Sequence, residues 1–191
     1  MDSNALFTEA LAQATTVIKQ VRDDQFGSAT PDTDWSVRDL AHHMLYELSW
    51  VPEILEGRLP EEVGPRYEGS LFEDATQLGI LWDRAAVRAE NELETYRPDR
   101  VVHLSYGDST AEAYLQEAAT DQLIHAWDLG ESIGLSVSFE RPVAEEVYDR
   151  LRGMDLQSSG LFAPPLDVPP NADLQTKILA LTGRTPDWRS V

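Results

Sequence analysis

The stretch Asp-Gln-Leu-Ile-His-Ala-Trp-Asp-Leu at residues 121–129 lies in an apolar segment that contains neither proline nor glycine, which predicts a helix. Asp121 and His125 are four residues apart in it. On a helix their side chains lie roughly 40° apart around the axis and about 6 Å apart along it. A carboxylate oxygen and an imidazole nitrogen can then converge on one point, where they either pair with each other or hold a cation. A cation site requires a third ligand from elsewhere in the chain.

Helical spacing of apolar residues recurs on both sides of this stretch. The segment with Asp121 begins at Thr110, a residue type that caps helices, and ends near Gly130 or Gly134. Capping-box patterns, Ser36-x-x-Asp39 and Ser70-x-x-Glu73, open two other helices. The further predicted helices cover residues 3–22, 36–57, 70–96, 141–156 and 172–181.

Four of these helices are long, and a long connection separates the second from the third. This order predicts an all-α fold, a four-helix bundle with one long crossover and short additional C-terminal helices. Residues 101–106, Val-Val-His-Leu-Ser-Tyr, form either a short strand or an extended connector, so strand content should be near zero. The length of 191 residues suits a single domain over residues 1–191.

Composition limits the classes of function. The net charge is −19, from 34 acidic and 15 basic residues, which disfavours a nucleic-acid partner. No run of about 18 apolar residues predicts a membrane span, and the polar N-terminus lacks the pattern of a secretory signal, so we expect a cytoplasmic protein. The chain has no cysteine, which excludes thiolate zinc sites and a catalytic cysteine. Any thiol in its chemistry must come from outside.

His43 is the candidate third ligand, because bundles build metal sites from side chains that project inward from facing helices. Zinc and its neighbours accept imidazole and carboxylate ligands where thiolate is absent. Two plainer readings stand beside this one. His43 could be a hydrogen-bonded core histidine, with its neighbour His42 about 100° away around the helix, and Asp121 with His125 could be a surface pair.

Three stretches resemble a known family. Residues 35–43, Trp-Ser-Val-Arg-Asp-Leu-Ala-His-His, are similar to the W-x-V-R-D-L-x-x-H signature of the actinobacterial mycothiol-dependent maleylpyruvate isomerase N-terminal family. Residues 103–108 resemble the segment before that family's last bundle helix, and residues 120–129 resemble its second metal motif. The likeness runs to Leu-Thr-Gly-Arg-Thr-Pro at 181–186. The wider superfamily is the DinB-like four-helix bundle, which includes bacillithiol- and mycothiol-dependent S-transferases.

The resemblance implies that His43, Asp121 and His125 bind a divalent metal, with zinc the favoured ion. The family's isomerase has glutamate at the acid position, whereas this chain has the shorter Asp121. The isomerase also carries a C-terminal domain for which this chain is short, so maleylpyruvate isomerisation itself does not follow from the resemblance.

Residues next to the ligands are candidates for supporting roles. Asp128 lies three residues after His125, where it either accepts the second imidazole N–H, contacts Arg38 or stays at the surface. Tyr46, three residues after His43, could reach an open coordination position or simply pack. Trp127 is a core or wall residue of a pocket.

Two functions from different classes fit these observations. In the first, the metal activates a low-molecular-weight thiol such as mycothiol, which attacks an electrophilic small molecule, as in a thiol transferase or an isomerase-like enzyme; a metal-hydroxide hydrolase is a variant. In the second, the chain is a non-catalytic, metal-stabilised module that binds a small ligand or another protein. An accessible fourth position beside a pocket favours the first function, and a closed site favours the second. An apolar flank of the bundle would allow a homodimer.

Overall fold

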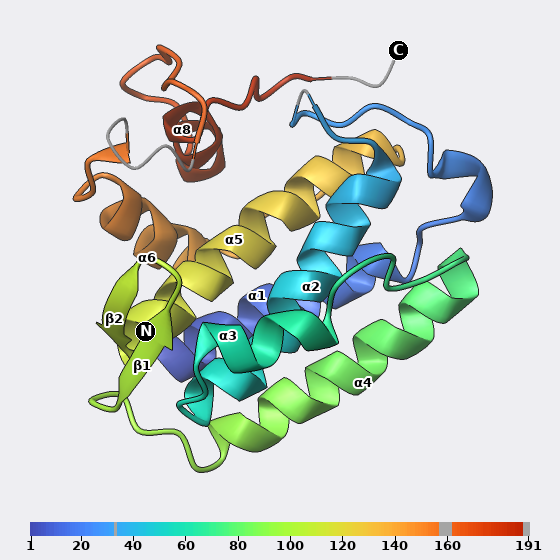
Figure 1. Ribbon diagram of the computed structural model, residues 1–191. Coiled ribbons are helices and arrows are strands. Elements are labelled where there is room, and N and C mark those ends of the chain that lie inside the picture. Colours follow the sequence, from blue (N-terminus) through green and yellow to red (C-terminus); the bar gives the residue numbers. More distant parts are fainter. Residues whose placement is uncertain (33, 157–161, 189–191) are drawn as a thin grey trace.

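The computed structural model describes residues 1–32, 34–156 and 162–188 (Figure 1). Within them the long helices are α1 Ser3–Ile18, α2 Val37–Leu55, α4 Ala75–Leu93 and α5 Ala111–Ser132. The shorter elements are α3 Pro60–Val63, α6 Arg141–Leu151, α8 Leu174–Leu181 and the strands β1 Val101–Leu104 and β2 Gly107–Thr110. Two 3₁₀ turns, Asp23–Gln25 and Gly64–Arg66, lie in the connections.

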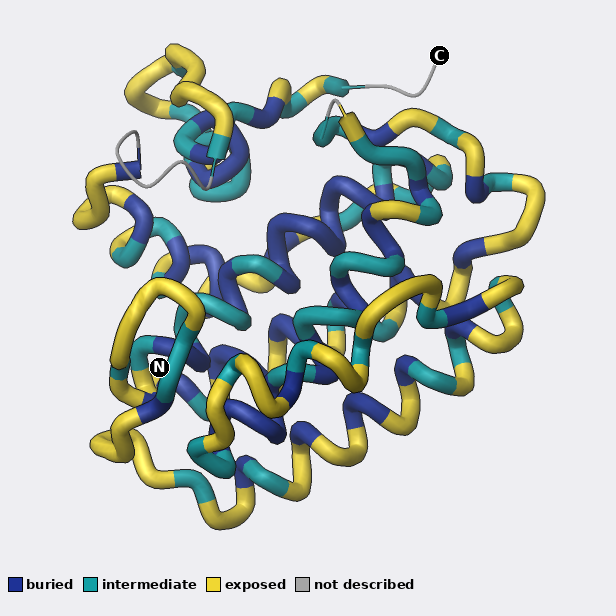
Figure 2. Tube along the Cα trace, in the orientation of Figure 1, coloured by how far each residue is buried: buried dark blue, intermediate teal, exposed yellow. Residues whose placement is uncertain are grey.

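The four long helices form a bundle, as the sequence predicts. α1 packs on α5 and α4, and α2 packs on α4 and α5. Each contributes a fully buried side chain to one core: Phe7, Met44, Trp82 and Leu123. Figure 2 shows α4 alternating between buried and exposed residues along its length, whereas α5 is buried almost throughout its second half. The crossover between α2 and α4 spans residues 56–74 and carries α3.

Two of the three predicted N-cap residues agree with the observed starts of the helices. Ser36 and Asp39 form the predicted capping box at the start of α2, and Thr110 caps α5. The predicted start at Ser70 is wrong, because α4 begins at Ala75, capped by Asp74. Ser70 instead donates its hydroxyl to the carbonyl of Phe72, in an irregular stretch that buries the Phe72 ring.

Residues 101–110 form a β-hairpin. Val101 pairs with Thr110 and Leu104 with Gly107 in an antiparallel register, so the strand reading of this segment is confirmed. Val102 is its buried residue, and Gly107 takes a φ of 132° that favours glycine. The hairpin packs against α5 and is the only sheet in the described part of the chain.

The C-terminal helices are shorter than predicted. The helix predicted over residues 141–156 ends at Leu151, and the one predicted over 172–181 begins at Leu174, capped by Asp173. Residues 157–161 lie outside the described part of the chain. α6 packs on α8, and in Figure 1 the C-terminal segment lies on the side of the bundle that α5 forms.

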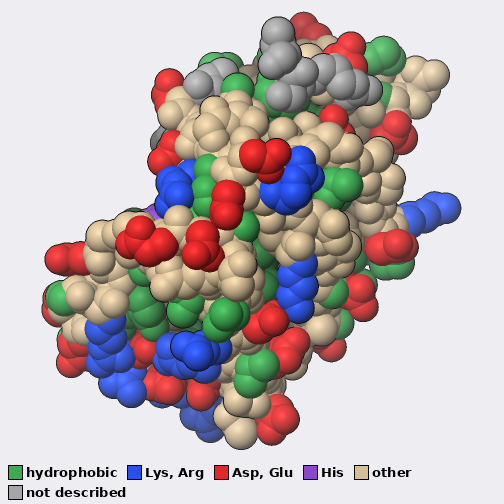
Figure 3. Space-filling view, turned by 90° about the vertical axis from the view of Figure 1, so that its right-hand side faces the viewer, with side chains coloured by type: hydrophobic (Ala, Val, Ile, Leu, Met, Phe, Trp, Pro, Cys, Tyr) green, Lys and Arg blue, Asp and Glu red, His purple; other side chains and the backbone are tan. Residues whose placement is uncertain are grey.

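Figure 3 shows acidic and basic side chains scattered over the face in view, with hydrophobic side chains in small groups between them. The homodimer stays a prediction. Among the described helices, none combines the length and the apolar content needed to cross a bilayer.

A buried carboxylate braces the crossover. Glu53 of α2 is almost completely buried and pairs with Arg58, Arg66 and Arg88 at 2.9, 2.9 and 2.7 Å. The Tyr67 hydroxyl also donates to it, at 3.2 Å. Burial alone would raise the pKa of Glu53, but the hydrogen bond and charge of Arg88 outweigh burial and lower the pKa below its ordinary value.

Replacing this carboxylate should weaken the fold in a pH-dependent way. At pH 7 we expect Glu53→Gln to lower the free energy of unfolding by about 2 kcal/mol, because it weakens several charge-assisted hydrogen bonds. A lowered folded pKa gives a stabilisation that is complete above 4.5, the ordinary value, and is lost as pH falls through the folded value. The difference should therefore shrink towards pH 3. Urea unfolding at both pH values measures it. Glu56→Gln, which disturbs one exposed pair with Arg58, should cost under about 1 kcal/mol, and equal costs for the two variants would contradict the account.

Candidate metal centre

The three predicted ligands meet between α2 and α5. His43 lies in the second turn of α2, and Asp121 and His125 lie one turn apart on α5. The Asp121 Oδ1 atom is 3.4 Å from His43 Nε2 and 3.3 Å from His125 Nε2. The two imidazole rings stand edge to face, with their centroids 4.9 Å apart. Two packed helices therefore bring one carboxylate and two imidazoles to a common point.

These separations match a metal site. An ion about 2.0–2.2 Å from each ligand in a tetrahedral arrangement holds neighbouring ligand atoms roughly 3.3–3.6 Å apart. Ordinary N–H···O bonds are shorter, about 2.7–3.2 Å. The ligand atoms of all three residues lie within 4.8 Å of one another. The chemistry of the donors, two imidazoles and a carboxylate, also suits zinc.

Asp121 shows two signs of an electrostatic role. Burial alone would raise the pKa of its carboxyl, but the adjacent His125 and His43 imidazoles outweigh burial and hold the pKa well below its ordinary value. Its other oxygen, Oδ2, is buried and has no hydrogen-bond partner among the described residues. A buried carboxylate oxygen without a partner is costly, so this atom has unused capacity for a ligand or an ion.

Asp128 orients His125 from behind. It is fully buried, and its Oδ2 accepts a hydrogen bond from His125 Nδ1 at 3.0 Å. This bond turns Nε2 towards the ligand cluster, which is the usual arrangement for a metal-binding histidine. Burial alone would lower the pKa of His125, but the Asp121 and Asp128 carboxylates outweigh it and raise that pKa to about 10.

Arg184 balances the charge of Asp128. Its guanidinium Nη2 donates to Asp128 Oδ2 at 2.9 Å and to Asp32 Oδ2 at 3.1 Å. Asp32, His125 and Asp128 also lie close enough together to suggest a second cation site. Because the Arg184 guanidinium lies between the Asp32 and Asp128 carboxylates, it already supplies the positive charge for this group of residues.

The turn after α8 places this arginine. Gly183 has a φ of 75°, and the Arg184 N–H closes the helix end by donating to the Leu179 carbonyl at 2.8 Å. A Cβ on Gly183 would come within 2.5 Å of the Ala163 Cβ. Only glycine fits this position without strain or a shift of Ala163.

The ligands border a cavity of about 560 Å³. Its walls include the aromatic rings of Trp35, Tyr106, Tyr114 and Phe162, and the Trp35 ring lies 4.7 Å from the His43 ring. A smaller cavity of about 220 Å³ adjoins it and is lined by Tyr46, Trp50 and Ile54 among others. Residues common to both linings, such as Glu47 and Glu117, lie where the two cavities meet. The space suits a small molecule.

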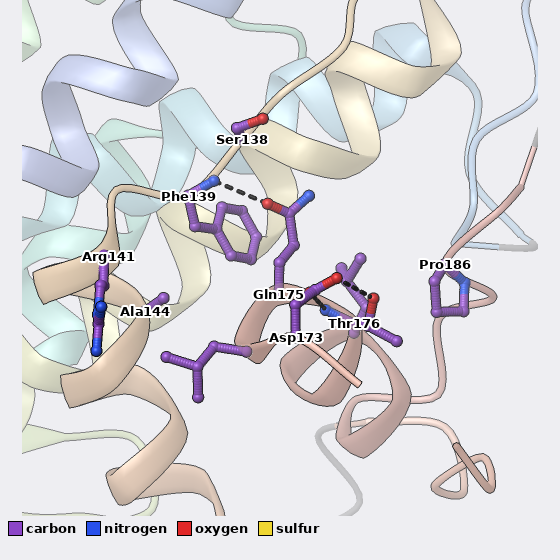
Figure 4. Close-up of a pocket in the computed structure, with 10 residues that line it drawn as sticks. Ser138, Phe139, Arg141, Ala144, Asp173, Gln175, Thr176 and Pro186 are labelled. Atoms are coloured by element: carbon purple, nitrogen blue, oxygen red, sulfur yellow. Dashed lines mark hydrogen bonds between the residues drawn. The ribbon is translucent and has the colours of Figure 1, made fainter. Parts of the chain in front are cut away.

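A cavity of about 640 Å³ lies elsewhere, between the start of α6 and α8 (Figure 4). Its polar groups are engaged locally. Gln175 accepts from the Phe139 N–H at 2.8 Å, and Asp173 accepts from the Thr176 N–H and hydroxyl. None of its described residues belongs to a group that could hold a metal ion. The chemistry therefore concentrates in the cavity beside His43.

Comparison with known proteins bears on this geometry. Residues 7–130 match the family model of the mycothiol maleylpyruvate isomerase N-terminal domain. The chain belongs to this family. The match covers α1 to α5 up to Gly130, and so includes all three candidate ligands of this family member.

Relatives and solved structures extend the comparison. Uncharacterised proteins from two strains of Mycobacterium tuberculosis are 25% identical over 176 residues, which is 88% of this chain and 90% of theirs. Two crystal structures titled mycothiol-dependent maleylpyruvate isomerase, one of a histidine-to-alanine mutant, superpose with TM-scores of 0.55 and 0.58. They are 15% identical to this family member and cover 78% of it, whereas it covers 66% of each isomerase chain. At this identity they show the shared fold.

The structure shows which of the roles predicted for Asp128, Tyr46 and Trp127 agree with their contacts. Asp128 accepts from His125, as one reading proposed, and its cation partner is Arg184. The alternative contact with Arg38 is wrong, because that guanidinium donates to the Phe72 and Glu73 carbonyls. Tyr46 lines the smaller cavity, not the one beside the ligands. Trp127 is buried in the core and lines neither cavity.

The other two histidines of the chain, His42 and His103, do not belong to the group of three candidate ligands. His42 bonds the Gly69 carbonyl through Nε2 at 2.9 Å, as expected if only one of the adjacent pair faces inward. His103 bonds Asp108 within the hairpin at 2.8 Å. Both histidines therefore serve as natural controls for experiments on His43 and His125.

Sequence reasoning missed three residues of the site. Arg184 lies in the Leu-Thr-Gly-Arg-Thr-Pro segment that resembles the family, so its position held a signal that spacing alone lacks. Glu47 lies four residues after His43, on the same face of α2, and helical periodicity could have found it. Asp32 lies in a loop, where no local pattern marks it.

Glu47 offers a test of the electrostatics. Burial and the negative charge of Asp121 raise its pKa to about 7. A raised folded pKa weakens the metal-free fold as pH climbs from 4.5, the ordinary value, through 7. We expect Glu47→Gln to stabilise the metal-free protein by about 1–2 kcal/mol at pH 8 and to change little at pH 4. Denaturant unfolding at both pH values measures this. The exposed Glu90→Gln should change neither, and an equal effect of Glu47→Gln at the two pH values would contradict burial and the Asp121 charge as the cause.

Proposed function

We propose that this chain holds a divalent metal ion, preferably zinc, on His43, Asp121 and His125, and that it activates a low-molecular-weight thiol such as mycothiol for reaction with a small electrophile. Residues 1–191 act as one domain in this proposal, and the protein works in the cytoplasm. One observation carries it. Ligand atoms of His43, Asp121 and His125 lie within 4.8 Å of one another and border a cavity of about 560 Å³.

The chemistry follows from this arrangement. A divalent ion in this position would supply a Lewis acid that lowers the pKa of a thiol or water bound to it. The chain supplies three ligands and leaves a side open to the cavity, which is typical of catalytic sites and not of structural ones. Asp128 fixes the orientation of His125, and Trp35 packs over His43. The accessible cavity favours the enzyme over a non-catalytic metal-stabilised module.

Membership of the family supports a thiol such as mycothiol as the cosubstrate. The matched family model and the names of the two structurally similar enzymes both include mycothiol. The chain covers only 66% of each isomerase chain, so we extend the thiol chemistry to it and leave maleylpyruvate out of the proposal. The absence of cysteine is compatible with a thiol that arrives as a cosubstrate.

A fluorescent alkylation tests the proposal. Mycothiol and monobromobimane react when the thiol loses its proton to the buffer, the sulfur bonds the bimane methylene carbon and bromide leaves with the electron pair of the broken bond. We expect the zinc-loaded protein to raise the rate of bimane fluorescence at least tenfold over the uncatalysed reaction, an amount typical of lowering a thiol pKa. Because the protein has no cysteine, all the thiol consumed is mycothiol.

Matched variants locate the activity. His43→Ala should abolish the rate increase, and His42→Ala should retain it, since His42 bonds a backbone carbonyl outside the cluster. No acceleration by protein that carries one zinc per chain would overturn the enzyme. The metal-stabilised binding module would then be the better account.

A further inference from the structure

The cavity beside the ligands has an unbalanced charge. Its lining contains five carboxylates and two guanidinium groups. The carboxylates belong to Asp32, Asp34, Glu47, Glu117 and Asp121. A bound divalent ion would offset two negative charges, which would still leave the lining with more carboxylates than cationic charges. Because like charges repel strongly in a partly dehydrated cavity, this excess acts on any charged ligand.

Both guanidinium groups have partners, Arg184 through several hydrogen bonds and Arg150 through one. Arg184 is almost completely buried and binds Asp128 and Asp32 at 2.9 and 3.1 Å. Arg150 donates to Gln116 at 3.2 Å and lies 4.0 Å from a Glu117 oxygen. Among the described residues of the lining, no other arginine or lysine is present to receive the carboxylate of a ligand.

Two carboxylates of the lining, those of Glu47 and Asp121, have no arginine partner in the part of the protein that the structure describes, although Asp121 faces His43 and His125 through its Oδ1 atom. Glu47 has no hydrogen bond or ion pair within the described part of the chain, and it lies where the two cavities meet. The buried Oδ2 of Asp121 also has no partner among the described residues. These groups share the cavity with aromatic rings, which attract cations through their faces and accommodate uncharged groups equally well.

We infer that the electrophile of this site is uncharged or carries an amine, and that carboxylic acids, dicarboxylates above all, are excluded from it. The inference rests on the proposed function only in identifying this cavity as the one that receives the substrate. Selectivity arises from unpaired like charge, which raises the energy of the wrong ligand without adding contacts to the right one.

Three unreactive probes of one shape test the charge preference. Benzylamine, benzamide and benzoate differ chiefly in charge and carry a ring that suits the aromatic walls. They are titrated into the metal-free protein, with dissociation constants taken from ligand-observed NMR and the Trp35 indole signal reporting the site. We expect benzylamine to bind at least tenfold more tightly than benzoate, with benzamide nearer to benzylamine.

Variants make the test specific to the cavity. Glu117→Gln removes the carboxylate beside Arg150, so benzoate should bind at least fivefold more tightly and benzylamine more weakly. Glu90→Gln removes the same charge from an exposed position of α4 and should change neither constant. Benzoate binding as tightly as benzylamine, or a benzoate affinity unmoved by Glu117→Gln, would overturn the inference.

The experiment separates this inference from the proposed function. The titration needs neither metal nor thiol, so a missing charge preference would overturn the inference and leave the metal site intact. A protein that prefers benzylamine but takes up no zinc would give the opposite result, in which the charge preference holds and the thiol chemistry fails.

Discussion

Asp128→Ala should destabilise the protein by about 3–5 kcal/mol, the cost of leaving one partner of a buried ion pair without the other. Asp128 is fully buried and binds both His125 and the guanidinium of Arg184. Its carboxyl is held ionised, because the His125 hydrogen bond and the Arg184 charge outweigh burial and lower its pKa. Removing it leaves Arg184 with the half-exposed Asp32 as its carboxylate partner. Chemical denaturation of the metal-free protein measures the loss.

The control uses the second carboxylate on the same guanidinium. Asp32→Asn disturbs an ion pair whose acidic side chain is 37% exposed, so it should cost under about 1 kcal/mol. Zinc affinity gives a second readout. Without Asp128 to fix the His125 ring, we expect it to fall roughly 10–100-fold, the usual result of losing such a hydrogen bond. An Asp128 variant as stable as Asp32→Asn would show that the buried network contributes little.

Loss of the shared carboxylate should strongly weaken metal binding. Asp121→Asn keeps the shape of the side chain and removes the charge that faces both imidazoles. Because zinc sites bind with about 10–16 kcal/mol, the loss of one of three ligands should lower affinity by roughly a thousandfold or more. Competition with a chromophoric chelator at constant pH measures the change. Glu47→Gln also neutralises a carboxylate of the cavity, and it should lower affinity far less because Glu47 is outside the ligand group.

Much of the fold follows from local pattern. The 3.6-residue spacing of apolar side chains predicted all four long helices, and polar caps such as Ser36 and Thr110 marked two of their starts. Ser70 misled because a capping-box pattern lies four residues before the real cap, Asp74. Phe72 lies between them and is buried in the core, in a stretch that is not helical.

The sequence predicted the three candidate metal ligands but few of the residues that support them or line the cavity. Spacing alone placed Asp121 and His125 on one face of α5. His43 was a candidate from a facing helix with a core histidine as the alternative, and resemblance to a family favoured it as the ligand. The sequence offered no rule for the contact between Asp128 and Arg184, which lie 56 residues apart. That contact depends on α8 docking over the bundle and on the turn at Gly183. Cavity walls such as Glu117 and Arg150 likewise come together only through packing.

Zinc content tests the central claim most directly. Elemental analysis is made on untagged protein purified in zinc-supplemented buffer and then desalted, as wild type and as His43→Ala, Asp121→Ala and His42→Ala. We expect about one zinc per chain in the wild type and in His42→Ala, and almost none in the other two variants. Wild-type protein that retains no metal, or equal zinc in all four proteins, would contradict a metal centre on His43, Asp121 and His125.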